Sequence, residues 1–414
     1  MNGNGVNTAE LVHEGAYILL VLGLFVLPHL LERFRLPSAI TSLALGAIAG
    51  ITFGWFQADQ TVILLSTFGI VALFLFAGLD ADFSLLKREG PIILAHLAWR
   101  SLSLVVVTWI VMLVFPIAWR PAFLVALALL TPSTGFILSS LSGFGLTPAE
   151  RDAVKTKAIA GEILALVGRF ICLQSVDAQR FLVAGSAVIG LVVALPIAFW
   201  LFATYLLPRG PKTEFAFLMV MAIVCASVTK MLGAYYLLGA FLAGIVAQRT
   251  RHYVPTMVSP RMVETIEIFA SFFIPFYFFH AGLELRAADF SWMAVMTGVG
   301  FLIIVLPGRI FALVAHRRWF QPMHHGLPIR AAVALIPTLV FTLVIAAILR
   351  DSFDVPAPIF GGLIIYALIN TMVPAFILRT PAAQLDFTSP AVVDVPADAG
   401  SLPTSAPTMQ QDAK

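Results

Sequence analysis

Apolar runs long enough to cross a bilayer recur along almost the whole chain. A transmembrane helix needs about 20 apolar residues, because the hydrocarbon core is about 30 Å thick and each helical residue rises about 1.5 Å. Hydrophobic residues make up 60% of the 414 residues and charged residues only 11%, whereas ordinary soluble proteins carry about 25% charged residues. This composition excludes a soluble enzyme, a disordered chain and a transmembrane β-barrel, whose alternating strands keep mean hydropathy low. It predicts an all-α polytopic membrane protein.

The apolar runs predict about 13 transmembrane helices within residues 16–380. Residues 1–15 form a short N-terminal segment. Residues 381–414 contain five prolines and little periodicity, so they are predicted to be a disordered tail. The expected helices span residues 16–33, 37–55, 61–79, 91–116, 121–143, 150–174, 179–206, 214–230, 233–248, 264–283, 290–315, 328–349 and 357–378.

The distribution of Lys and Arg predicts the orientation, because cytoplasmic loops carry an excess of them. Thirteen basic residues follow odd-numbered helices and five follow even-numbered ones. The N-terminal segment is therefore predicted to be extracytoplasmic and the tail cytoplasmic. The net charge of +3 does not indicate a nucleic-acid partner. The first group is Arg33, Arg35, Lys87, Arg88, Arg151, Lys155, Arg209, Lys212, Arg249, Arg251, Arg261, Arg317 and Arg318; the second is Arg120, Arg180, Lys230, Arg286 and Arg350.

Two predicted helices are interrupted near mid-span by proline. The fifth contains Thr131, Pro132, Ser133, Thr134 and Gly135, and the twelfth contains Pro337 and Thr338. Proline removes a backbone hydrogen bond, and simple kinks of this kind are common in membrane helices. The two helices are seven apart and therefore cross the bilayer in opposite directions. Matching breaks in oppositely oriented helices are typical of inverted-repeat transporters, in which unwound backbone and half-helix ends hold an ion near the midplane.

Few ionisable residues lie inside the predicted helices, where each costs about 2.5–3.5 kcal/mol on insertion scales. Glu162 is a carboxylate far from either end of its helix, and Arg100, Arg169 and Arg309 are the accompanying cations. In a water-filled cleft, Glu162 could exchange a proton for a cation, because either one neutralises it. The alternative is a fixed ion pair with a buried arginine. Arg169 is close enough to the outer end to extend its guanidinium toward the interface, whereas Arg309 is deeper.

Three further motifs resemble those of a known family. Residues 238–244 (LGAFLAG) are similar to its G-A-F-x-A-G signature. Residues 273–283 (FIPFYFFHAGL) are similar to its F-x-P-x-F-F-x-x-x-G-L helix, and residues 76–80 (FAGLD) to its early F-x-x-G-L-E segment. Together they resemble the second branch of the monovalent cation:proton antiporters, the Kef-like and NapA-like exchangers, over residues 16–380.

The resemblance implies a thirteen-helix fold with inverted repeats, two crossed discontinuous helices, a dimerisation domain and an ion-transport domain. It implies a homodimer in the cell membrane that exchanges Na⁺ or K⁺ for H⁺ by alternating access, with no cofactor and no metal beyond the transported ion. The family's ion-binding acid is an Asp preceded by Asp, Asn or Gln, whereas this chain has Gly161 and Glu162.

On this basis Glu162 is the expected shared site for proton and cation, and polar residues at the two breaks are its expected co-ligands. Arg309 matches the family's basic residue on helix 11. One carboxylate that exchanges one proton for one monovalent cation indicates electroneutral exchange. The absence of a polar side chain at Gly161 keeps a second possibility open, a non-transporting membrane sensor or regulatory subunit on the same fold. No enzyme motif is present. The co-ligands are Thr131, Ser133, Thr134 and Thr338; the broken-helix residues are Pro132, Gly135 and Pro337; and the charge-compensating residues are Arg309, Arg169 and Arg100.

Overall fold

The computed structural model describes residues 8–81, 90–210, 213–232, 236–250, 259–320, 329–353 and 355–378, and these residues fold into helices joined by short connections. All thirteen predicted segments are helical. Most predicted bounds agree to within a few residues, although the helix expected to end near residue 315 continues to Phe320. The tail at 381–414 and the first seven residues lie outside the described residues.

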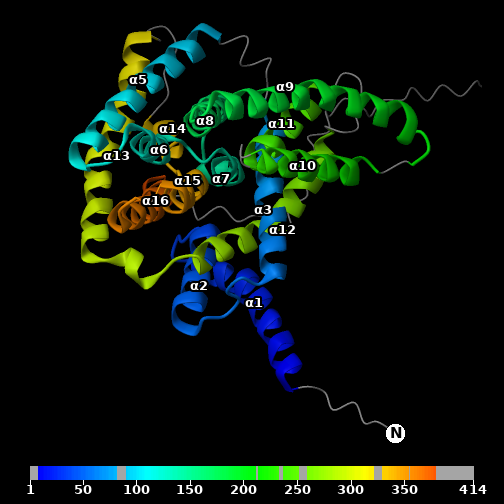
Figure 1. The fold of residues 1–414 in the computed structure, drawn as a ribbon, viewed down its shortest axis with the longest axis horizontal. Helices are drawn as coiled ribbons and strands as arrows, with labels where there is room; N and C mark the ends of the chain where they lie inside the picture. Colours follow the sequence, from blue (N-terminus) through cyan, green and yellow to red (C-terminus); the bar gives the residue numbers. More distant parts are fainter. Residues whose placement is uncertain are drawn as a thin grey trace, which may run out of the picture.

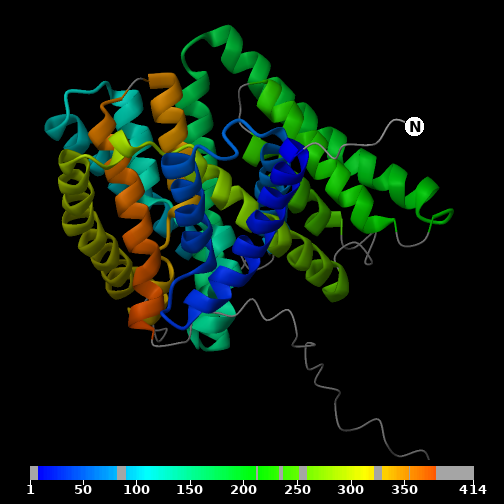
Figure 2. The ribbon, with the colours of Figure 1, turned by 90° about the horizontal axis from the view of Figure 1, so that it is seen from below.

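The helices form two bundles that lie side by side (Figure 1; Figure 2). We call the first the scaffold bundle and the second the core bundle. A long helix, α9 (Ala178–Leu201), follows α8 of the core bundle and precedes α10 of the scaffold bundle along the chain. The scaffold bundle consists of α1 (Thr8–Glu32), α2 (Ser38–Ile48) with a π-helical turn (Ala49–Phe53), α3 (Gln60–Leu79), α10 (Glu214–Met231), α11 (Tyr236–Arg249) and α12 (Pro260–Leu283). The core bundle consists of α5 (Gly90–Val114), α6 (Trp119–Leu130), α7 (Thr134–Ser140), α8 (Pro148–Gln174), α13 (Trp292–Phe320), α14 (Ile329–Ala334), α15 (Leu339–Phe353) and α16 (Ala357–Ile377).

Within the described residues, ten helical segments are long and apolar enough to cross a membrane. The consecutive helices α6 and α7 count as one such segment, and so do α14 and α15. The other three predicted spans correspond to α2 with its turn, to α11 and to α8. The first two are apolar but shorter. Helix α8 has 27 residues and carries more charged residues than the ten candidate spans. The structure therefore accounts for every predicted segment as helix.

Glycines let the scaffold helices approach backbone to backbone. A Cβ on Gly46 of α2 would overlap the carbonyl of Phe279 on α12, and a Cβ on Gly282 would overlap the carbonyl of Leu43. Small residues of this kind permit close van der Waals packing between membrane helices. Gly54 has a different role, because it ends the turn in the left-handed conformation with φ of 65°.

Among the described residues of the core bundle, two predicted spans are interrupted in their middle, and each interruption lies at a proline. The residue before a proline is disfavoured in the helical region, and Thr131 accordingly adopts an extended conformation where α6 ends. Helix α14 ends at Ala334, three residues before Pro337. By contrast, Pro275 and Pro307 lie inside continuous helices. The two breaks are thus specific features of the core bundle and not a general effect of proline in this chain.

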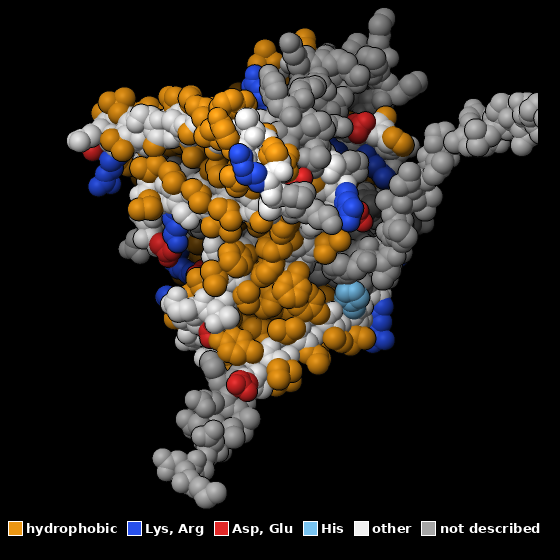
Figure 3. Space-filling model, turned by 90° about the vertical axis from the view of Figure 1, so that its right-hand side faces the viewer, with side chains coloured by type: hydrophobic (Ala, Val, Ile, Leu, Met, Phe, Trp, Pro, Cys, Tyr) orange, Lys and Arg blue, Asp and Glu red, His pale blue; other side chains and the backbone are white. Residues whose placement is uncertain are grey.

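Large hydrophobic side chains cover the outside of the molecule. Figure 3 shows broad hydrophobic patches on one face, interrupted by a few charged side chains. Leu182, Val193 and Trp200 of α9 are 68%, 58% and 57% exposed, respectively. Soluble monomers rarely expose such continuous apolar surface, so this surface is suited to contact with lipid.

Candidate functional site

The two helix breaks meet in the middle of the core bundle. The backbone N–H of Ser133 donates a hydrogen bond of 2.8 Å to the carbonyl of Pro337. Nearby, the Thr342 hydroxyl donates to the carbonyl of Ala128, also at 2.8 Å. Breaking a helix leaves backbone donors and acceptors without their intrahelical partners, and each break here satisfies part of the other. The segments around Pro132 and Pro337 therefore form one crossed unit.

Glu162 lies on α8 beside this unit and is 2% exposed. Its carboxyl lies next to Thr134, the first residue of α7. One carboxyl oxygen, Oε2, is buried and has no hydrogen-bond partner in the described structure. No described ion pair joins Glu162 to a basic side chain. A buried oxygen of this kind costs free energy unless something binds it.

The cavity at Glu162 lies between the two bundles and has no room for a water molecule. One wall belongs to α3 of the scaffold bundle and the other to the core bundle. A Cβ on Gly135 would lie 2.6 Å from the Leu73 side chain, so glycine is required for α7 to lie this close to α3. The scaffold residues are Leu73, Phe74 and Ala77, and the core residues are Ser133, Gly135, Glu162, Val340 and Phe341.

Arg309 of α13 binds the backbone that the breaks expose. It is 7% exposed. Its Nη1 donates to the carbonyls of Ile336 at 2.8 Å and Leu129 at 3.3 Å, and its Nη2 donates to the carbonyl of Leu335 at 3.0 Å. The Tyr366 hydroxyl accepts from Nη1 at 3.2 Å and donates to Leu129 at 2.8 Å. The guanidinium thus bridges the last turns before both breaks and does not contact Glu162.

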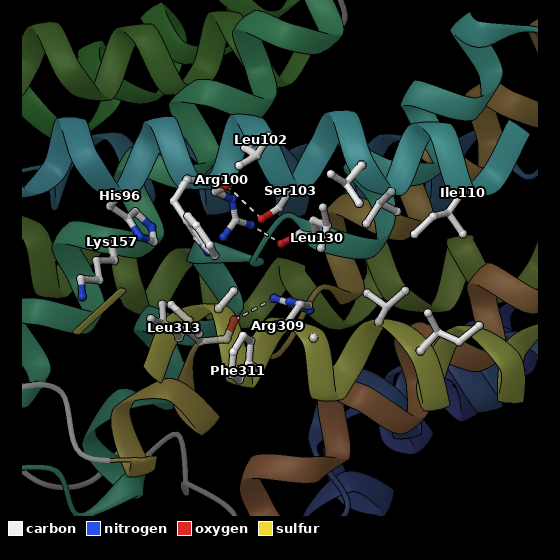
Figure 4. A pocket seen from close by; sticks show the side chains of 18 residues that line it. His96, Arg100, Leu102, Ser103, Ile110, Leu130, Lys157, Arg309, Phe311 and Leu313 are labelled. Carbon is white, nitrogen blue, oxygen red and sulfur yellow. Dashed lines mark hydrogen bonds between the residues drawn. The ribbon is translucent and has the colours of Figure 1, made fainter. Parts of the chain in front are cut away.

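Arg100 approaches the first break from the other side. Its Nη2 donates to the carbonyl of Leu130, the last residue of α6. Figure 4 shows Arg100 on α5 and Arg309 on α13 extending from opposite helices toward the same region. The Arg100 guanidinium also lies beside Gly161, where a Cβ would be 3.4 Å from Cζ. Arg100 therefore occupies the space beside Gly161, the residue that precedes Glu162.

The remaining predicted residues are not all at the carboxylate. The Thr338 hydroxyl accepts a hydrogen bond of 3.1 Å from Asn370, and its oxygen lies 2.9 Å from that of Thr342, whose proton is donated to Ala128. Arg169 is 2% exposed, so it is enclosed by protein and its guanidinium does not reach the interface. Sequence reasoning missed Tyr366 and Asn370 of α16. Their spacing of four puts them on one helix face, and two polar residues on one face of an apolar helix are a signal that could have identified them.

The two ends of α8 differ in how closely the bundles meet. At one end Lys155 Nζ lies 3.0 Å from Asp80 Oδ2, at the end of α3, so an ion pair links the core bundle to the scaffold bundle. At the other end, a cavity of about 880 Å³ lies beside Leu173 and Gln174 and extends to Met231 of α10 and Ser352 of α15. Glu162, near the middle of α8, thus lies between an ion pair that links the two bundles and a cavity between them.

Known proteins resemble the chain over nearly its whole length. Residues 18–383 match the family described as "Sodium/hydrogen exchanger, transmembrane". A Na⁺/H⁺ antiporter of Enterococcus hirae is 21% identical over 381 residues, covering 88% of this chain and 97% of that protein. The K⁺/H⁺ antiporter 1 of Saccharomyces cerevisiae is 24% identical over 427 residues, covering 90% of this chain and 46% of that protein.

A solved structure shares the fold. The sodium proton antiporter MjNhaP1 from Methanocaldococcus jannaschii, at pH 8, superposes with a TM-score of 0.64 and 14% sequence identity. The match covers 89% of this chain and 96% of that chain. At this identity the likeness concerns the arrangement of helices alone.

Proposed function

Because the chain belongs to the family of transmembrane sodium/hydrogen exchangers, we propose that it exchanges a monovalent cation, Na⁺ or K⁺, for H⁺, with Glu162 as the shared site. The family consists of transporters, so the chain is not an enzyme. The observation that carries the proposal is the buried Oε2 of Glu162, which has no hydrogen-bond partner and lies beside two crossed helix breaks. Proton and cation each satisfy this oxygen, and both cannot do so at once.

The broken helices supply the surroundings that a partly dehydrated cation needs. Hydroxyl and carbonyl oxygens replace water around alkali cations in membrane proteins. Ser133 lines the cavity and Thr134 lies next to the carboxyl, so we assign these two side chains as the first co-ligands, with Thr131 and Thr338 at the margins. Since Thr338 is already bonded to Asn370 and Thr342, its contribution is to hold the second break in place.

The charge arithmetic favours electroneutral exchange. Glu162 is the one carboxylate that lines the cavity, and Arg309 cannot release its proton at physiological pH. One proton therefore leaves for each monovalent cation that binds. Apparent cation affinity should weaken about tenfold for each unit of pH decrease where the carboxyl is mostly protonated, as expected for one proton displaced per cation.

Alternating access follows from the position of the site between the bundles. A cavity lies beside Gln174 at one end of α8, and the Lys155–Asp80 ion pair links the bundles at the other end. Moving the core bundle along the scaffold bundle would break the ion pair, close the cavity and carry Glu162 to the other side. We assign residues 16–380 as this exchanger unit.

The orientation and assembly complete the proposal. The excess of basic residues after odd-numbered helices places the N-terminus outside and the C-terminal segment in the cytoplasm, and the exposed apolar surface of the bundles suits a homodimer in the cell membrane. A cysteine introduced at Asn4 should react with an impermeant maleimide applied to whole cells, and a cysteine at Ser401 should not. Reaction of both or of neither, or of Ser401 alone, contradicts this topology.

The decisive experiment uses purified protein in liposomes, with internal pH followed on addition of Na⁺, K⁺ or Li⁺. Glu162→Gln keeps the shape of the side chain and removes the charge, so it should fold and carry no cation-dependent proton flux. Glu162→Asp should retain flux with altered affinity. The matched control is Glu264→Gln, which removes an exposed carboxylate from α12 and should leave flux unchanged.

The same experiment also tests the alternative function, a non-transporting sensor on this fold. This alternative is open because position 161 is a glycine without a polar side chain. A sensor predicts no cation-dependent proton flux in the wild-type protein. Wild-type rates in Glu162→Gln would instead show that the carboxylate is structural and that the site lies elsewhere.

A further inference from the structure

The scaffold side of the Glu162 cavity consists of apolar side chains from one helix. Leu73, Phe74 and Ala77 of α3 form this wall, and all three are buried. Helix α3 is the scaffold helix that lies against α7 of the core bundle (Figure 1). None of the three side chains carries an oxygen that could bind a cation. What the wall determines is how much space remains for whatever binds to Glu162.

Leu73 is the wall residue that lies against the first helix break. A Cβ built on Gly135 would be 2.6 Å from both Cγ and Cδ1 of Leu73, so the leucine side chain lies directly on the first turn of α7. Gly135 follows Thr134, which lies next to the Glu162 carboxyl, and Ser133 lines the same cavity. Leu73 therefore contacts the short segment that supplies the two proposed co-ligands.

Backbone contacts behind α3 hold Leu73 in place. Leu75 and Gly78 are two and five residues further along, which puts them on the opposite face of the helix. A Cβ on Gly78 would be 2.4 Å from the carbonyl oxygen of Phe241 on α11, and a Cβ on Gly244 of α11 would be 2.4 Å from the carbonyl oxygen of Leu75. Since the two backbones are already in contact, α3 cannot yield toward α11 to enlarge the cavity.

The core side of the cavity is also held in place. Val340 and Phe341 of α15 line it and are buried. The next residue, Thr342, donates a hydrogen bond of 2.8 Å to the carbonyl of Ala128 on α6. Enlarging the cavity on this side would pull α15 away from α6 and break a buried hydrogen bond. Both walls of the cavity are therefore rigid.

A rigid cavity of this size discriminates between alkali cations. It has no room for a water molecule, and K⁺ is about as large as water, whereas Na⁺ and Li⁺ are smaller. Selectivity between cations of equal charge depends on cavity size, on the ligands and on how far they can adapt. A carboxylate also attracts a small cation more strongly, because the two charges come closer together. Size and charge thus favour the same ions.

We propose that Leu73 sets the upper size of the cation that Glu162 can hold, so that the protein exchanges Na⁺ or Li⁺ in preference to K⁺. This inference rests on the proposed exchange at Glu162 and adds a specificity-determining residue from the scaffold bundle, which supplies no ligand. To bind K⁺ while α3 covers the site, the protein would have to press α3 into α11 or separate α15 from α6.

Two variants of Leu73 enlarge the cavity, and one variant of the same helix is the matched control. Leu73→Ala removes the atoms that lie on Gly135. Leu73→Val removes less of the side chain and serves in case Leu73→Ala does not fold. Leu75→Ala makes the same change at a leucine that is 0% exposed and is not among the residues that line the cavity. It therefore measures the effect of losing a buried leucine from α3.

The first experiment measures proton flux in liposomes at a series of Na⁺ or K⁺ concentrations. The wild type and Leu75→Ala should need at least about tenfold more K⁺ than Na⁺ for half-maximal flux, the scale on which a tight pocket discriminates one methylene. Leu73→Ala should lower this ratio about tenfold, and Leu73→Val should lower it by less. An unchanged ratio in both Leu73 variants, an equal change in Leu75→Ala, or no preference for Na⁺ in the wild type would overturn the proposal.

The second experiment separates the size limit from the exchange itself. Thermal unfolding in detergent with NaCl, KCl or choline chloride detects cation binding without transport, because an ion that binds the folded state raises the Tm. Na⁺ should raise the Tm of the wild type more than K⁺ does, the difference should shrink in Leu73→Ala, and Glu162→Gln should lose the Na⁺ effect.

The two experiments together distinguish the two proposals. The expected pattern of Tm values without any flux would contradict the exchange at Glu162 and support the size limit. Flux that depends on Glu162 with equal effects of Na⁺ and K⁺ would support the exchange and overturn the size limit. A Na⁺ effect no larger than that of choline, or one that Glu162→Gln keeps, would also overturn it.

Discussion

The scaffold bundle and the core bundle both consist largely of apolar helices, and close glycine contacts occur in each, as between Gly298 of α13 and Gly362 of α16, but the core bundle adds a second kind of contact. In the scaffold bundle, glycines bring backbones into direct contact, as where Gly78 of α3 meets Gly244 of α11. In the core bundle, polar side chains reach backbone atoms of other helices, as where Arg309 and Thr342 bind carbonyls at the end of α6. Continuous helices need no such partners, because their backbone groups are already paired.

This difference indicates why we place the proposed ion site at the core bundle. A site for a dehydrated cation gains from unpaired backbone oxygens inside the membrane, and a continuous helix has none to offer. Opening two helices provides them, and Arg309, Tyr366, Asn370 and Thr342 then satisfy the groups that the ion does not use. The scaffold helices expose no such backbone groups at a break, so they can pack as closely as their glycines allow.

The largest effect is expected from a side chain at a backbone contact in the scaffold bundle. Gly46→Val would place two methyl groups against the Phe279 backbone, where even a Cβ overlaps. Overpacking of this kind usually costs about 1–3 kcal/mol, and more where backbone cannot move. We expect the variant to be lost from the membrane fraction. Gly190→Val on α9, where a Cβ meets no atom within 4 Å, should express normally; equal expression of both would contradict the packing argument.

The second largest effect is expected at Arg309. Arg309→Ala removes the donor from the buried carbonyls of Leu335 and Ile336, while that of Leu129 keeps its bond from Tyr366, and each unsatisfied group costs about 1–3 kcal/mol. The variant should lose transport, melt at a lower temperature than the wild type, or both. Arg100→Ala should lose less stability, because one described carbonyl depends on it. Wild-type melting together with wild-type flux in Arg309→Ala would show that the guanidinium is not needed at the breaks.

A smaller effect on the unfolding free energy is expected at two buried threonines, one in each bundle. Thr342→Val removes a hydrogen bond from α15 to Ala128 of α6 and should cost about 1 kcal/mol, within the range for polar contacts between membrane helices. Thr229→Val in α10 removes only bonds to Cys225 and Ala226 of its own helix. That change should alter the unfolding free energy by less, as measured by denaturation in detergent. Equal costs would mean that the threonine bonds do not distinguish the bundles.

The smallest effect on stability is expected where the two bundles meet. Lys155 and Asp80 are 38% and 23% exposed in their side chains, and pairs of this kind contribute about 0.2–1 kcal/mol. A double-mutant cycle with Lys155→Gln and Asp80→Asn should give a coupling energy in this range. A coupling above about 2 kcal/mol would contradict the description of this contact as a weak, partly exposed ion pair.

The positions of the breaks and of Glu162 could be predicted, because each has a local signature. Thr131-Pro132-Ser133 combines a missing backbone donor with polar neighbours, and a lone carboxylate in mid-helix is rare. The partners could not be predicted in the same way. The choice of carbonyls bound by Arg309 depends on helix crossing, and the polar face of α16 at Tyr366 and Asn370 does not by itself specify Thr338 as the partner of Asn370.

Proline alone was an ambiguous signal, because its effect depends on what surrounds it. Pro307 lies in continuous α13, whereas Pro132 ends α6. In α13 the neighbours Leu306 and Gly308 offer no polar side chain as an alternative partner for the backbone. At the breaks, the crossing helix provides one, as the Ser133–Pro337 hydrogen bond shows. This contact belongs to the tertiary structure and is absent from the sequence around either proline.

The two permanently charged guanidiniums in the core bundle have a consequence for the energetics of the cycle. Arg100 and Arg309 cannot shed their protons, so they travel with the core bundle in both directions. Whatever work the membrane voltage does on them in one half-cycle is returned in the other. In the proposed exchange, the Glu162 carboxylate is neutralised on each passage, once by a proton and once by a cation. Under that proposal the voltage can favour one resting position of the core bundle, but the direction of net exchange depends only on the two ion gradients.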